Sequence, residues 1–345
     1  MARAPVLSIP GQMSAAGTTL TRHVMTKQKG LAPAADLALI LERIALIGKR
    51  IACELAQSSI AGQLGYTGAT NVQAEKVKKL DAWTNEVFLE TFADGYPVCS
   101  LISEEMDKAR HWPENCREPS YVVLCDPLDG SSNTDVNCSL ATIFSIRRRA
   151  AGHNTAVADI LRPGTEQVAA GYVLYGPGTQ LVYTAGAGVD IFTLDRSLGE
   201  FILWRENVRM PPRGSTYAVN QGNAGKWHPG ARKFIDHITS RKDKSTSYSL
   251  RYSGAFAADF HRCLLEGGIY LYPGEVSEGG KSTGKLRLMY ELAPLSFVAE
   301  QAGGRGSTGK GRILEVVPAA IHERQPIYIG SAAEVELAEK MQVEA

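Results

Sequence analysis

The 345-residue chain lacks any long apolar run, which limits where the protein can reside. No stretch approaches the roughly 20 apolar residues that a membrane-spanning helix needs, so we expect no membrane partner. The first residues, MARAPVLSIPGQMSAAG, lack the apolar core of a secretory signal. Together these absences predict a cytoplasmic protein.

An excess of charge of either sign is also missing. Lys and Arg total 37 and Asp and Glu total 36, which leaves a net charge of +1. This balance provides no electrostatic footprint for nucleic acid or for an anionic membrane surface. The content of 44% hydrophobic and 21% charged residues is typical of a globular protein.

The six cysteines are scattered, and none forms a Cys-x-x-Cys pair. Such spacing predicts free thiols in a reducing compartment, with neither a zinc site nor a disulfide framework. Two near-matches to the nucleotide-binding phosphate loop, GGKSTGK and GRGSTGK, also fail. Leu286 and Gly311 stand where that loop requires Ser or Thr.

Helical and strand patterns alternate through the whole chain. Apolar spacing predicts helices over residues 37–55, 77–93, 230–240, 254–268 and 284–304. Strands are predicted over 98–105, 121–125, 142–149, 169–186 (a hairpin), 189–195, 215–222, 268–273 and 325–331. We therefore predict mixed α/β layers, divided into a loose tail (1–18), an N-terminal domain (19–205) and a C-terminal domain (206–345).

Acidic side chains stand at the ends of two predicted strands. SLISEE delivers Glu104 and Glu105, and VVLCDPLD delivers Asp126 and Asp129. If these strands are neighbours, four carboxylates meet at one sheet edge, where their mutual repulsion calls for a divalent cation. Oxygen ligands favour Mg²⁺, or Mn²⁺ as a substitute, and the Leu128 carbonyl is a further candidate ligand.

The residues that follow Asp129 are suited to binding an anion. Gly130 lets the backbone come close, and the N–H groups of Gly130, Ser131 and Ser132 can surround a phosphate beside the metal. The combination predicts metal-assisted hydrolysis of a phosphate ester. The alternative, an Asp-rich turn that caps a helix, leaves the second acidic strand end unexplained.

Three segments carry a resemblance to a known family: DPLDGSSN, the upstream SEE and the downstream GKLRLMYELAPLSFVAEQAGG. The chain resembles the class I fructose-1,6-bisphosphatases. NVQAEKVKKLD, RYSGAFAADFHR and YLYP extend the resemblance over nearly the whole chain. It implies a five-layer αβαβα fold, Mg²⁺ dependence, a homotetramer and removal of the 1-phosphate from fructose 1,6-bisphosphate, in gluconeogenesis or the Calvin cycle.

The resemblance also implies roles for individual residues. The implied metal ligands are Glu75, Glu104, Asp126, the Leu128 carbonyl, Asp129 and Glu291. Asp81 and Glu105 are the implied activators of water, acting with Asp126 and Asp129 in catalysis. The implied substrate-binding residues are Asp129, Gly130, Ser131, Ser132, Asn220, Arg251, Tyr252, Tyr272, Lys285 and Arg287, with Arg251 reaching a neighbouring subunit. Asn223 departs from the animal members of the family, in which a Tyr contacts the 6-phosphate.

The sequence is also compatible with other functions. The closest is a sedoheptulose-1,7-bisphosphatase or an enzyme that accepts both sugars, since the two substrates differ by one CHOH unit. From a different class, a catalytically silent sugar-phosphate sensor would be indicated by loss of a metal carboxylate, and none is lost. A scaffold protein would not need a series of acids at strand ends.

Overall fold

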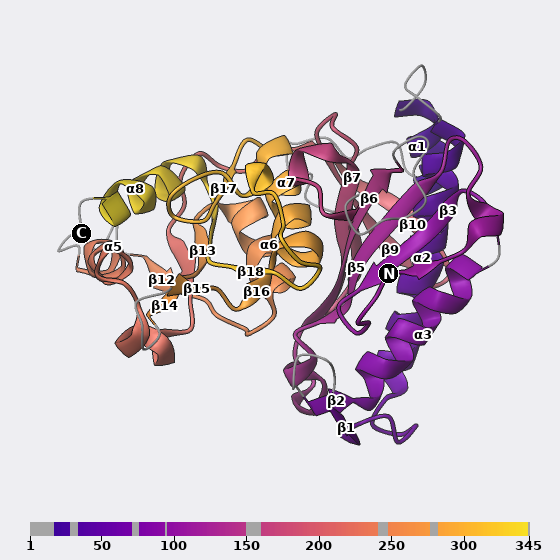
Figure 1. Ribbon diagram of the computed structural model, residues 1–345, viewed down its shortest axis with the longest axis horizontal. Helices are drawn as coiled ribbons and strands as arrows, with labels where there is room; N and C mark the ends of the chain where they lie inside the picture. Colours follow the sequence, from indigo (N-terminus) through magenta and orange to yellow (C-terminus); the bar gives the residue numbers. More distant parts are fainter. Residues whose placement is uncertain are drawn as a thin grey trace, which may run out of the picture.

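The computed structural model describes residues 17–27, 34–70, 76–93, 95–149, 160–240, 248–276 and 282–343. Its helices and sheets stack along the long axis as helices, sheet, helices, sheet, helices (Figure 1). The predicted five-layer αβαβα architecture is therefore confirmed. Among the described residues, no helix combines the length and apolar character that crossing a bilayer requires.

The larger sheet has eight strands in the order β10-β9-β8-β7-β6-β5-β3-β4. Neighbours run antiparallel except β3 and β5, which are parallel. The strands are β3 (Val98–Ser103), β4 (Arg110–His111), β5 (Tyr121–Asp129), β6 (Leu140–Arg148), β7 (Gln167–Tyr175), β8 (Thr179–Thr184), β9 (Val189–Asp195) and β10 (Glu200–Val208).

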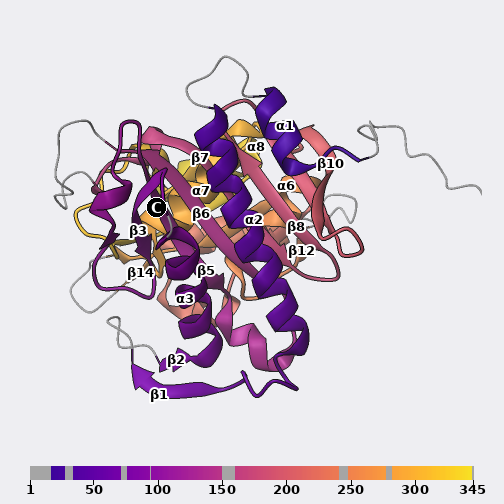
Figure 2. The same cartoon turned by 90° about the vertical axis from the view of Figure 1, so that its right-hand side faces the viewer.

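Three helices, α1 (Leu20–Lys27), α2 (Ala34–Gln57) and α3 (Lys79–Ala93), cover the outer face of this sheet (Figure 2). The stripe predicted for residues 37–55 is the buried face of α2, where Leu41, Ile44 and Ile51 are inaccessible to solvent. The helix predicted over 77–93 begins two residues later, because Lys76–Lys78 form β2, which pairs with β1 (Tyr66–Thr70).

Two central helices, α6 (Phe256–Glu266) and α7 (Ala293–Gln301), fill the space between the two sheets (Figure 1). The smaller sheet has the order β12-β11-β13-β19-β17, and α5 (Pro229–Thr239) and α8 (Ala332–Val343) cover its far face. Its strands are β11 (Thr216–Ala218), β12 (Ser249–Leu250), β13 (Ile269–Tyr272), β17 (Arg305–Ser307) and β19 (Ile327–Gly330). The division at 205/206 stays a prediction, and β10 continues to Val208.

Short elements complete the fold. Two more two-stranded sheets join β14 (Glu275–Val276) to β15 (Ser282–Thr283), and β16 (Leu286–Arg287) to β18 (Arg324–Gln325). The single turns of helix are η1 (Pro113–Asn115), η2 (Ser131–Val136), η3 (Gly164–Glu166), η4 (Gln221–Lys226), η5 (Leu288–Leu292) and η6 (Ile313–Glu315).

The helix predicted over residues 284–304 is wrong in its first third. Leu286 and Arg287 form a strand instead, and the Leu288 N–H donates to the Glu323 carbonyl at 2.7 Å. These bonds to a distant segment replace the helical ones. A wide π-helical turn, η5, then leads into α7, whose first turn contains Pro294. Proline suits that position because its missing N–H needs no partner there.

We predict that Gly171→Ala will strongly destabilise the protein, because Gly171 lies in the middle of β7. A β-carbon at Gly171 would lie 2.1 Å from the Val182 carbonyl oxygen and 2.7 Å from the Phe144 ring. Such overpacking should lower the free energy of unfolding by about 3 kcal/mol or more, measured as a lower urea midpoint.

Gly178→Ala is the matched control for this substitution. It lies in the adjoining β7–β8 turn, and a β-carbon there meets nothing within 4 Å. We expect a change within about 0.5 kcal/mol. Equal effects of the two substitutions would contradict the close packing described for β7.

Candidate active site

The parallel pairing of β3 with β5 brings the two acidic strand ends together. Ser103 is opposite Cys125, and the Glu104 N–H donates to the Cys125 carbonyl at 3.1 Å. Glu104 and Asp126 therefore leave adjacent strands at the same edge, and both are largely buried, at 9% and 4% exposure. The condition on which the sequence argument depended, that these two strands are neighbours, is met.

The C-terminal end of β5 and the glycine that follows it are held by short-range contacts. Asp126 Oδ1 accepts a hydrogen bond from the Leu128 N–H at 3.0 Å. Gly130 is in the left-handed region (φ 79°), and a β-carbon on it would lie 2.5 Å from Cβ of Ala255. Only glycine combines this backbone conformation with so close an approach.

Asp129 connects the first sheet to the central layer. Its two carboxylate oxygens accept hydrogen bonds from the Phe256 N–H (3.1 Å) and the Ala257 N–H (2.7 Å). These are donors of the first turn of α6, which lack partners within the helix. A carboxylate is also favoured there by the helix dipole. The cap comes from 127 residues upstream, so the contact joins the larger sheet to the central helical layer.

Glu291 supplies a further carboxylate from η5. One carboxylate oxygen from each of Asp126, Asp129 and Glu291 lies within 4.8 Å of the others, and all three side chains are buried. The Arg287 guanidinium contacts this group from the side, 2.8 Å from Glu104 and 4.0 Å from Glu291. The site therefore contains several buried acids and one Arg side chain. The carboxylates supply an oxygen-rich set of ligands, which fits a hard divalent ion.

The pKa values of these acids show how much negative charge is concentrated here. Burial, followed by repulsion from Glu104, raises the pKa of Asp126 well above its usual range. Burial raises the pKa of Asp129 to about 7, although the two α6 N–H bonds oppose the shift. Burial and Glu104 raise that of Glu291 to about 8. A bound cation would replace the protons that these groups otherwise retain.

The acids predicted to activate water lie at the border of this cluster. Asp81, in the first turn of α3, is 7% exposed and accepts from the Lys78 N–H at 3.3 Å. Burial raises its pKa to about 6, and Glu104 adds to the shift. Glu105 is half-buried beside the cluster, and its N–H donates to Ser103 Oγ.

The predicted phosphate-binding serines follow Gly130 directly in η2. Ser131 is half-buried and Ser132 is exposed. Asn133 anchors this turn, because its amide donates to the carbonyls of Ser139 (3.0 Å) and Ser253 (3.1 Å). The second of these bonds joins η2 to the segment that precedes α6.

The residues predicted for the second phosphate come from three places: Asn220 precedes η4, Tyr272 ends β13, and Lys285 precedes β16. Asn223 Nδ2 donates to the Tyr272 hydroxyl at 3.0 Å, and Lys285 Nζ lies 5.6 Å from the centre of the Tyr272 ring. Asn220 caps η4 by accepting from the Gly222 N–H at 3.1 Å. These four residues form one polar group around Tyr272.

Arg251 and Tyr252 lie on the exposed segment after β12. Arg251 Nη1 bonds to its neighbour's carbonyl, and the side chain is exposed to solvent. Burial, followed by Tyr272, Asp259 and Asp129, raises the pKa of Tyr252 to about 12. Tyr252 is therefore within electrostatic range of both the acidic cluster and the polar group around Tyr272.

Glu75 lies outside the described residues. Arg287 was predicted to bind substrate, and its side chain is only 5% exposed and pairs with Glu104. Lys285 and Glu291 do not share one helix, as the sequence suggested, because the chain between them is a strand and a π-helical turn.

Lys78 and Asp259 are polar residues of the site that the sequence did not single out. Lys78 Nζ pairs with Asp135 at 2.7 Å and with Thr134 at 3.1 Å, so it links the end of β2 to η2. Asp259 accepts from the Ser253 N–H at 2.9 and 3.0 Å. The signal for Asp259 was the segment RYSGAFAADFHR, and the signal for Lys78 was the neighbouring VKKLD.

Comparison with known proteins identifies the family. Residues 18–206 match the family model for the fructose-1-6-bisphosphatase N-terminal domain, and residues 210–343 match that for the C-terminal domain. The chain belongs to the fructose-1,6-bisphosphatase family. A fructose-1,6-bisphosphatase class 1 of Trichormus variabilis is 50% identical over 321 residues, which is 92% of this chain and 90% of that one. A Synechocystis relative of the same name is 47% identical over 325 residues, or 93% and 92% of the two chains.

Solved structures of the family agree with this fold. The holo form of Leishmania major fructose-1,6-bisphosphatase superposes with a TM-score of 0.87 at 38% identity, over 94% of this chain and 99% of that one. The T-state structure from the same organism gives a TM-score of 0.83, also at 38% identity, over 95% and 99% of the two chains.

We predict that Mg²⁺ will stabilise the protein more at high pH than at low pH. The raised pKa values of Asp129 (about 7) and Glu291 (about 8) mean that the folded, metal-free protein binds more protons than the unfolded chain. Its free energy of unfolding therefore falls as pH rises from about 4 through about 8. Mg²⁺ binds the deprotonated acids, so it offsets this loss only where they have ionised.

Thermal melting with and without Mg²⁺ measures the effect at about pH 5.5 and at about pH 8.5. We expect the larger rise in Tm at the higher pH, and a much smaller pH dependence in Asp126→Asn. An equal rise at both pH values would show that the ion binds away from these acids.

Proposed function

We propose that this protein hydrolyses the 1-phosphate of fructose 1,6-bisphosphate to give fructose 6-phosphate and inorganic phosphate. The observation that carries the proposal is the buried acidic cluster at the shared end of β3 and β5, which continues directly into Gly130 and the serines of η2. Membership of the family and the names of its class 1 relatives support the choice of sugar.

The proposed metal is Mg²⁺, with Mn²⁺ as a substitute. The residues that would hold it are Glu75, Glu104, Asp126, the Leu128 carbonyl, Asp129 and Glu291. When bound, such an ion lowers the pKa of its water and offsets phosphate charge. The fit rests on the chain itself, because buried carboxyl groups with raised pKa values need either protons or cations.

In the proposed reaction, Asp81 and Glu105 take the proton from the attacking water. The pKa of Asp81, about 6, lies close enough to neutral pH for a general base that is ionised and still accepts a proton. Asp126 and Asp129 orient the reacting groups. The backbone N–H groups of η2, with Ser131 and Ser132, would bind the 1-phosphate, where backbone donors converge on an anion.

The second phosphate and the sugar would contact residues from the other half of the chain. We assign these contacts to Asn220, Tyr252, Tyr272, Lys285 and Arg287. Arg251 would extend into the site of a neighbouring subunit, which agrees with its exposed position. This arrangement needs a homo-oligomer, and we propose a tetramer in the cytoplasm.

Phosphate release from purified protein tests the proposal. We expect one phosphate per fructose 1,6-bisphosphate in the presence of Mg²⁺, and none in the presence of EDTA. Sedoheptulose 1,7-bisphosphate is assayed in parallel. Comparable rates on both sugars would identify a dual enzyme, whereas no release from either would contradict the proposed hydrolysis.

Asp126→Asn tests the acidic cluster, because it removes one charge with almost no change in volume. Loss of several kcal/mol of transition-state stabilisation corresponds to a fall in kcat of about a thousandfold or more. Glu104→Gln should act similarly. Asp236→Asn, at an exposed position on α5, is the control and should retain full activity. Substantial activity in Asp126→Asn, with Tm unchanged, would count against the metal assignment.

A further inference from the structure

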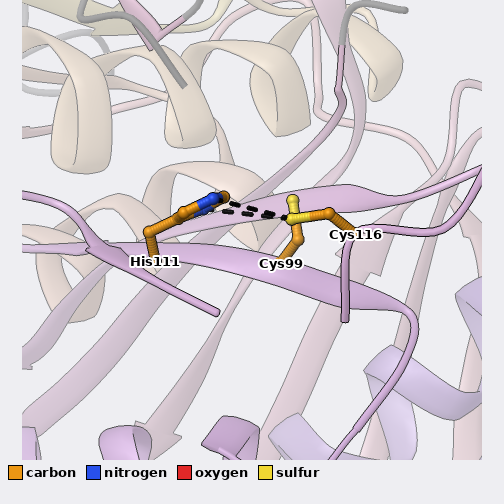
Figure 3. A group of neighbouring side chains, drawn as sticks. All are labelled: Cys99, His111 and Cys116. Carbon is orange, nitrogen blue, oxygen red and sulfur yellow. Dashed lines mark hydrogen bonds between the residues drawn. The ribbon is translucent and has the colours of Figure 1, made fainter. Parts of the chain in front are cut away.

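A second group of metal-ligating side chains lies at the edge of the larger sheet. Cys99 comes from β3, His111 from β4, and Cys116 from the residue after η1. We refer to Cys99, His111 and Cys116 as the Cys–His cluster. Figure 3 shows the imidazole and the two sulfur atoms turned toward one another.

The backbone holds these three side chains close together. Ser100 is opposite His111 in the antiparallel β3–β4 pair, and the Trp112 N–H donates to the Cys99 carbonyl at 2.8 Å. Cys116 Sγ lies 3.8 Å from His111 Nε2 (Figure 3). One ligand atom from each of the three residues lies within 4.8 Å of the other two.

These separations are close to those of a metal site. Zinc binds sulfur at about 2.3 Å and imidazole nitrogen at about 2.0–2.1 Å, which places tetrahedral ligands about 3.5–3.8 Å apart. The Cys–His cluster therefore needs only a small contraction to enclose an ion. Two thiols and one imidazole suit a soft or borderline cation, in contrast to the all-oxygen acids around Asp126.

The surroundings of His111 also match those of a ligand. Ser100 Oγ lies 3.0 Å from Nδ1, and Cys116 Sγ lies 3.9 Å from Nδ1 and 3.8 Å from Nε2, so a second-shell contact holds the ring beside the sulfur. Cys99 is fully buried, whereas His111 and Cys116 are half-buried. This leaves one side of the cluster near solvent, where water can complete the coordination.

We propose that Cys99, His111 and Cys116 form a binding site for a soft or borderline divalent cation such as Zn²⁺, with water as the fourth ligand. The ion would tie β3, β4 and the segment after η1 together. β3 ends one residue before Glu104, so the bound ion would brace the strand that delivers the two acids Glu104 and Glu105. The site is separate from the proposed catalytic centre in both position and chemistry.

Co²⁺ is the probe for this site, because thiolate ligands give Co²⁺ an intense sulfur-to-metal charge-transfer band that oxygen ligands do not. Reduced, metal-free full-length protein is titrated with Co²⁺. We expect a band that saturates at one ion per chain and disappears on addition of Zn²⁺. The signal is independent of phosphatase activity and of any ion bound at the acids.

Three variants make the result specific. Cys116→Ser should abolish the band. Ser100→Ala, which removes only the hydroxyl beside Nδ1, should weaken Co²⁺ binding by about tenfold. Cys53→Ser, at an exposed position on α2, should leave the band unchanged. No band in the wild-type protein, or a band that survives in Cys116→Ser, would overturn the proposal.

Discussion

The repulsion among buried carboxylates at the end of β3 and β5 is the constraint on which the rest of the structure depends. Parallel pairing forces Glu104 and Asp126 to the same edge, and η5 adds Glu291 to the same volume. A fold that only maximised stability would not gather these groups, because each loses hydration and repels the others. The pKa values of Asp126, Asp129 and Glu291 are raised because of this burial and mutual repulsion.

The surrounding elements limit that repulsion without abolishing it. Arg287 contributes a buried positive charge next to Glu104, and the first turn of α6 donates two N–H groups to Asp129. Neither contact fully neutralises the acids, so the remaining negative charge is available for a cation. The stability of this region and its proposed chemistry are thus set by the same charges.

The sequence predicts the layered fold well because the local signals agree with the tertiary ones. The stripe of α2, the hairpin of β7 and β8, and the acids after β3 and β5 all lie where the patterns indicate. The predicted helix over 284–304 is wrong at its start, because hydrogen bonds from β16 to β18 and from Leu288 to Glu323 involve residues more than 30 positions away. The Cys–His cluster was missed for a related reason. Its residues follow no Cys-x-x-Cys spacing, and it takes the β3–β4 pairing and the following η1 turn to bring His111 and Cys116 next to Cys99.

The hydrogen bonds of Asp129 restrict how parts of the subunit can move. Its carboxylate belongs to the first sheet and is bonded to the N-terminus of α6, while Gly130 lies against Ala255 with no room for a β-carbon. A hinge that moved the larger sheet away from α6 would have to separate these atoms. The acidic end of β5 and the first turn of α6 should therefore move as one rigid unit.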